Sequence, residues 1–250
     1  MAKIVRQRKP PLSAGESWNE NIQVSPTFTA CARKLGIAAA IGTVLLIVGY
    51  AFTLGIGLLS LPSPQEPIGD PIFSILEILI IVMMPPMIAL MAAVHAWAPA
   101  ESKVYGLLAV IFMSLVAAVT CSVHFVILAV GHQAGSPESA WSAMFLSFKW
   151  PSVPYALDVL AWDVFFALSV VCAAPVFGGS RLANSIRALL LASGLLALAG
   201  LTGLIFGDMR LRMIGVVGYV GVFPVAALLL GVLFHRTATP DRTRQSITVS

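Results

Sequence analysis

The chain has 250 residues, of which 58 % are hydrophobic and only 10 % are charged, with a formal net charge of +4. Soluble domains contain about 25 % charged residues, so this composition excludes a soluble globular enzyme and a disordered chain. The three cysteines are widely spaced, which excludes a disulfide-rich secreted fold. A polytopic membrane protein is the class that remains.

Six apolar segments are long enough to cross a hydrocarbon core, which requires roughly 20 residues in a helix. Their apolar residues are continuous instead of alternating, which indicates helices and not the strands of a barrel. The expected spans are Leu35–Leu59, Ile72–Ala96, Tyr105–Gly131, Val153–Phe177, Ala188–Gly207 and Met213–His235. The predicted fold class is therefore all-α, a six-helix transmembrane bundle over residues 35–235. A basic tail, residues 1–34, precedes it, and a polar tail, residues 236–250, follows it.

The basic residues predict the orientation of the bundle. With both termini in the cytoplasm, the inner segments hold twelve of the 15 Lys and Arg residues, and the outer segments hold Lys149, Arg210 and Arg212. The first 34 residues are too long and polar for a cleaved signal peptide, so we expect this tail to remain attached. We expect an integral protein of the plasma (inner) membrane, whose basic excess faces anionic lipid and not nucleic acid.

The connection between the third and fourth spans carries a helix signal of its own. Ser136 and Pro137 resemble a helix start, and an apolar stripe follows at i, i+3, i+4 and i+7, formed by Trp141, Met144, Phe145 and Phe148. This pattern predicts a short interfacial helix. Such a helix serves either as an anchor at the membrane surface or as a lid over a cavity in the bundle.

Five ionisable side chains share the outer leaflet, although they come from three consecutive spans. These candidate ligand-binding or proton-binding residues are Glu77, His124, His132, Asp158 and Asp163. An ionisable group inside a span costs about 2.5–3.5 kcal/mol on insertion scales, so each requires a partner or a function. Their common depth is the strongest functional signal in the sequence.

Helical spacing refines this cluster. Asp158 and Asp163 are five residues apart, or about 140° around an α-helix, so we expect them to face different neighbours. A carboxylate beside an imidazole can relay a proton, hold a cation or fasten two helices together. Arg210 or Arg212 could neutralise one carboxylate, which would favour fastening.

Prolines interrupt two of the predicted spans. Pro85 and Pro86 fall at the middle of the second span, and Pro224 falls at the middle of the sixth. Each proline frees a backbone carbonyl, and interrupted helices near the bilayer centre are typical of transporter sites. A packing kink is the alternative interpretation, so these residues are candidate gating or kink positions.

Small residues predict close helix contacts. Ala199, Gly203 and Gly207 form one stripe, and Gly215, Gly218 and Gly221 thin one side of the sixth span. These faces pack either within the bundle or against another copy or a partner membrane protein.

The sequence lacks zincin, nucleophile-elbow, Walker A and dinucleotide-binding motifs. We therefore expect no enzyme activity, no cofactor and no metal ion. The leading hypothesis is a membrane protein whose outer cluster binds or conducts a proton, a cation or a small cationic ligand. A non-catalytic accessory or scaffold protein is the alternative, and a membrane redox or metal protein is a third.

Overall fold

The computed structural model describes residues 28–63, 66, 68–131 and 140–237, and these residues contain helices but no β-strand. Six helices of the described residues are long and apolar enough to cross a membrane, which confirms the predicted number of long apolar helices. They extend over Ala30–Leu59, Ile72–Trp97, Ala100–Val130, Val153–Val176, Arg181–Phe206 and Met209–Arg236.

The first three spans are nearly regular helices, whereas the last three are composed of several segments. The first half contains α1 (Ala30–Leu59), α2 (Ile72–Trp97), the 3₁₀ turn η1 (Ala100–Ser102), α3 (Lys103–Val126) and the π-helical segment η2 (Ile127–Gly131). The fourth span contains α6 (Val153–Val159), the π-helical segment η3 (Leu160–Phe165), α7 (Phe166–Ala173) and the 3₁₀ turn η4 (Ala174–Val176). The fifth contains α8 (Arg181–Gly200) and α9 (Thr202–Phe206). The sixth contains the 3₁₀ turn η5 (Met209–Arg212), α10 (Met213–Val216), the π-helical segment η6 (Val217–Val222) and α11 (Phe223–Arg236).

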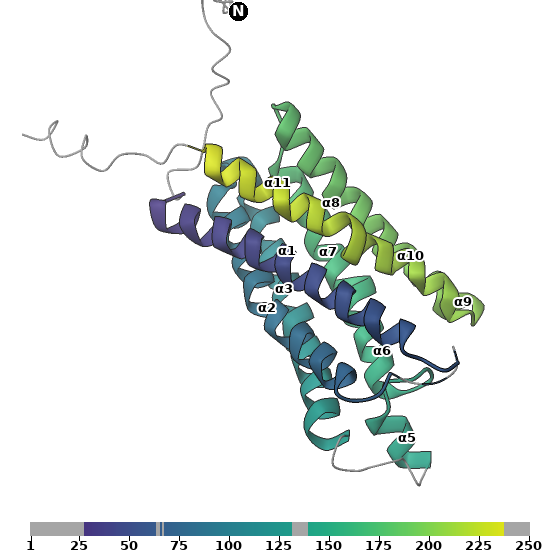
Figure 1. Cartoon of the computed structure of the whole chain (residues 1–250). Coiled ribbons are helices and arrows are strands. Elements are labelled where there is room, and N and C mark those ends of the chain that lie inside the picture. Colours follow the sequence, from purple (N-terminus) through teal and green to yellow (C-terminus); the bar gives the residue numbers. More distant parts are fainter. Residues whose placement is uncertain (1–27, 64–65, 67, 132–139, 238–250) are drawn as a thin grey trace, which may run out of the picture.

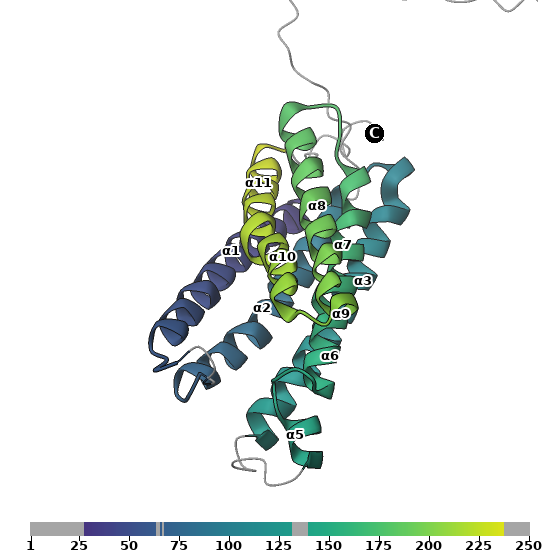
Figure 2. The same cartoon turned by 90° about the vertical axis from the view of Figure 1, so that its right-hand side faces the viewer.

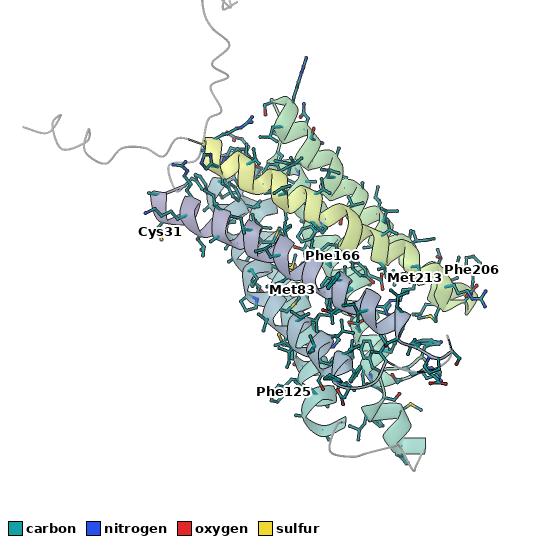
Figure 3. The ribbon with its side chains drawn as sticks, viewed as in Figure 1. Cys31, Met83, Phe125, Phe166, Phe206 and Met213 are labelled. Carbon is teal, nitrogen blue, oxygen red and sulfur yellow. The ribbon has the colours of Figure 1, made fainter. Side chains whose placement is uncertain are left out.

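Consecutive spans pack as neighbours in one bundle (Figure 1). Helix α1 lies between α2 and α11, α3 packs on α2 and α7, and α8 packs on α7 and the sixth span. The first turn of α1 and the last turn of α11 meet, since the Arg33 guanidinium donates hydrogen bonds to the carbonyls of Phe234 and His235. We call this the terminal end of the bundle, and the opposite end, where α5 and α9 lie, the distal end (Figures 1 and 2). Figure 3 shows Cys31 at the terminal end and Phe206 at the distal end.

The fifth helix begins earlier than the sequence pattern predicts. Helix α8 starts at Arg181 and not at Ala188, because the Ser180 hydroxyl accepts a hydrogen bond from the Ala183 N–H and caps the helix. Helix α1 likewise begins at Ala30, within the predicted basic tail, after a similar cap by Thr29. Polar caps therefore extend both helices beyond their apolar cores.

A short helix, α5 (Ala140–Leu146), lies in the connection between the third and fourth spans, where the apolar stripe predicts one. Trp141, Met144 and Phe145 of the stripe are exposed, whereas Phe148 lies over the bundle and contacts the His124 ring at 5.1 Å between centroids. The proposed start at Ser136 and Pro137 lies outside the described residues.

The prolines are accommodated in two ways. Pro85 and Pro86 lie within helix α2, which continues from Ile72 to Trp97, so the expected interruption of the second span is not present. Pro224 instead lies in the first turn of α11, directly after the π-helical segment η6, where no backbone N–H is required of it. The expected interruption at the middle of the sixth span is therefore a change of helix type. Its role in gating stays a prediction.

Candidate functional site

Three of the predicted site residues meet inside the bundle. Glu77 of α2, His124 of α3 and Asp158 of α6 are 3 %, 2 % and 6 % exposed. His124 lies between the two carboxylates: its Nδ1 is 2.8 Å from Glu77 Oε2, and its Nε2 is 3.4 Å from Asp158 Oδ1. One imidazole thus connects the second and fourth spans from its place on the third.

Arg212, at the end of η5, joins this chain to the sixth span. Its Nη2 donates to Asp158 Oδ2 at 2.6 Å, and its Nε donates to Asp163 Oδ2 at 3.1 Å. The guanidinium also lies over the Tyr155 ring, with Cζ 4.7 Å from the ring centroid. The possibility that an arginine of this turn neutralises a carboxylate is confirmed for Arg212, whereas Arg210 is exposed.

The expectation that Asp158 and Asp163 face different neighbours is wrong, because both contact Arg212. The π-helical segment η3 spans Leu160–Phe165. Its wider turn pairs residues five apart, so Asp163 falls one turn below Asp158 on the same face. An ideal α-helix would turn the two carboxylates apart.

Two glycines create the space that Asp163 occupies. A methyl group at Gly200 would lie 2.6 Å from Asp163 Oδ1, and one at Gly215 would overlap the same atom. Asp163 is fully buried, and within the described residues this Oδ1 has no hydrogen-bond partner. Of the small-residue face predicted on the sixth span, Gly215 and Gly218 therefore pack against the fifth span within the bundle, whereas Gly221 is exposed. Gly215 also leaves space for the Asp163 carboxylate.

The connected cluster has more acid than base. Three carboxylates, Glu77, Asp158 and Asp163, face one guanidinium and one imidazole. With every one of these described groups ionised, two cations would oppose three anions. The described residues include no group of three or more His, Cys, Asp and Glu side chains placed to hold a metal ion.

A cavity of about 390 Å³ borders this cluster between α1 and the second, third, fourth and sixth spans. His124, Asp158 and Arg212 form its polar wall. Its other walls are largely aromatic and aliphatic, with aromatic side chains from Tyr50, Phe148, Tyr155, Trp162 and Tyr219. Tyr155 and Trp162, three residues before and four residues after Asp158, line the cavity together with it.

Sequence reasoning missed the contributions of Tyr50 on the first span and Tyr219 on the sixth. Tyr50 and Tyr219 carry no charge, so a search for charged residues inside the spans does not select them. The only sequence signal for them is a polar hydroxyl group within an apolar span. Trp162 is 6 % exposed, and its indole N–H has no acceptor within the described part of the chain. His132, the fifth predicted site residue, lies outside the described residues.

Replacing Gly215 with alanine should break the Arg212–Asp163 contact, because the new methyl group occupies the position of Asp163 Oδ1. We expect Gly215→Ala to lower the free energy of unfolding by about 1–3 kcal/mol, measured by thermal unfolding in one detergent. Gly221→Ala is the matched control, since its methyl would meet only Val217 Cγ1 at 3.8 Å. Equal unfolding midpoints for the two variants would contradict the assigned role of Gly215.

Comparisons of this chain with protein-family models, with curated proteins and with solved structures give no match. We therefore take the function from the side chains themselves. Among the described residues, their geometry supplies a connected cluster of three carboxylates, one imidazole and one guanidinium beside an aromatic cavity.

Proposed function

We propose that this protein is a multi-pass membrane protein, not an enzyme, that binds a proton or a small cation at the Glu77–His124–Asp158 cluster and conducts it across the membrane. Both chain ends lie in the cytoplasm of this plasma-membrane (inner-membrane) protein, as the distribution of Lys and Arg predicts. The distal end then faces outward, and the ligand enters from the acidic outer side.

The excess of carboxylates carries this proposal. A buried charge without a counter-charge is costly in a low-dielectric interior. Three acids against two bases leave room for one more positive charge, either a proton shared within the cluster or a cation in the cavity. The imidazole between two carboxylates provides a short route for a proton, since its two nitrogens face one oxygen each.

The cavity supports a small organic cation as the second ligand. Aromatic faces attract cations, most strongly where water is excluded, and Tyr50, Tyr155 and Trp162 line the cavity beside Asp158. Phe148 covers the same cavity from the segment after α5, which fits the lid interpretation. The π-helical segments η3 and η6 and the prolines of α2 and α11 lie in the spans that would rearrange.

Replacing His124 with glutamine should abolish proton movement, because an amide keeps hydrogen bonds but cannot carry the proton. We expect the rate of proton uptake by reconstituted liposomes, driven by a potassium diffusion potential and read by an internal pH dye, to fall by about tenfold or more. His95→Gln is the control, since His95 lies at the terminal end and contacts the Lys103 carbonyl. Equal rates in wild type and His124→Gln would refute proton conduction through this residue.

Filling the cavity should remove cation binding without disturbing the helices. Gly49 and Gly55 both lie on α1, and a Cβ at either position would meet no atom within 4 Å. Only Gly55 lines the cavity. We expect tetraethylammonium to raise the unfolding temperature of wild type and of Gly49→Leu, and Gly55→Leu to weaken its apparent affinity by about tenfold or more, because the leucine takes up cavity volume. The same affinity in both variants would show that the cation does not bind there.

A scaffold function remains the second candidate, because most charged atoms of the cluster have a protein partner.

The variant Asp158→Asn distinguishes the conducting function from the scaffold function. If the cluster conducts, this variant should fold and lose proton uptake, since the amide retains hydrogen bonds but not the charge. If the cluster only fastens helices, unfolding should come first, with a loss of about 3–5 kcal/mol. Size-exclusion profile, unfolding midpoint and uptake rate are compared with those of Glu101→Gln, an exposed acid in η1 outside the cluster.

A further inference from the structure

A second hollow lies at the terminal end of the bundle, away from the charged cluster. It is a groove of about 390 Å³ between α1 and α11. Its lining on α1 is Ile37, Ala40 and Ile41, and on α11 it includes Leu228, Gly231 and Val232. A methyl group on Gly231 would lie 3.1 Å from Ala40 Cβ, so these small residues form the floor where the helices approach. Ile41 and Leu228 are 52 % and 53 % exposed, so the walls face outward.

The groove has a basic end. His235 and Arg236 line it there and are exposed. Lys34 is exposed as well and shares the face of α1 that carries Ile37 and Ile41, at spacings of three and seven residues. Neither α1 nor α11 contains an acidic residue. Within the described part of the chain, Arg236 forms no ion pair.

We propose that this groove binds an anionic phospholipid. The apolar lining has the chemistry of an acyl-chain site, and the basic residues at one end offer a counter-charge to the phosphate of the headgroup. In the proposed orientation this end faces the cytoplasmic leaflet, which is where anionic lipid attracts juxtamembrane basic residues. The site is independent of the distal cluster, because no residue lines both hollows.

Native mass spectrometry of the detergent-purified full chain, titrated with phosphatidylglycerol or with phosphatidylcholine of the same acyl chains, tests this assignment. We expect the anionic lipid to bind at lower concentration than the zwitterionic one. Arg236→Gln should weaken phosphatidylglycerol binding roughly fivefold, the effect of about 1 kcal/mol per basic residue, and leave phosphatidylcholine binding unchanged. The matched control is Arg181→Gln, an exposed arginine in the first turn of α8, outside the groove.

Three results would overturn the proposal. Equal binding of the two lipids by wild type would show that the basic end selects no headgroup. Equal weakening by Arg236→Gln and Arg181→Gln would show a diffuse surface attraction without a site. A dimer that persists when phosphatidylglycerol is added, but that is lost in the variant Ile41→Asn, would show that a second copy occupies the groove. A comparison of unfolding midpoints verifies that each variant is folded.

Discussion

The ion pairs that Arg212 makes with Asp158 and Asp163 constrain the rest of the distal half of this molecule. A guanidinium buried among apolar helices needs its acceptors close and well aligned, because removing one partner of a buried ion pair leaves the other charge uncompensated. This requirement explains three features of the backbone nearby. The π-helical turn η3 brings both aspartates to one face, Gly200 and Gly215 leave space for the Asp163 carboxylate, and the turn η5 places Arg212 at their depth.

The same interaction determines what His124 can do. Arg212 holds one oxygen of Asp158, so the other oxygen is the one that faces the imidazole. The second ring nitrogen faces Glu77, which has no arginine among its contacts in the described residues. The two carboxylates beside His124 are therefore unequal. In the proposed function, this asymmetry would place a bound proton on the Glu77 side of the imidazole, farther from the positive charge of Arg212.

The sequence predicts those parts of the fold that depend on hydropathy and on the free-energy cost of placing a charged group inside a span. Long apolar runs predict the six membrane-spanning candidates, and the helical spacing of apolar residues predicts a short helix where α5 lies. Glu77, His124 and Asp158 could be selected because a charge inside a span is rare, and a common depth on consecutive spans brings them together.

The sequence does not reveal helix type. The direction in which Asp163 points depends on a π-helical turn, whose extra residue leaves no pattern in an apolar run. The start of α8 was missed for a similar reason, since a serine cap and not hydropathy determines it. The cavity depends on the side chains of five spans and on their exact separation, which no local pattern contains.

The composition of the cluster favours the proposed binding site over a cluster that only fastens helices. Helices in a membrane associate well through small residues and close packing, and the fifth and sixth spans do so here at Gly200, Gly215 and Gly218. A buried ion pair adds little net stability over apolar side chains of similar volume. If a cluster served only to fasten helices, the free-energy cost of burying its charges would be lowest when positive and negative charges were equal in number. This one has three acids and two bases, one acid oxygen without a hydrogen-bond partner in the described residues, and a cavity along its polar wall. Such an imbalance is costly for a fastening but suits a site whose missing positive charge arrives as a ligand.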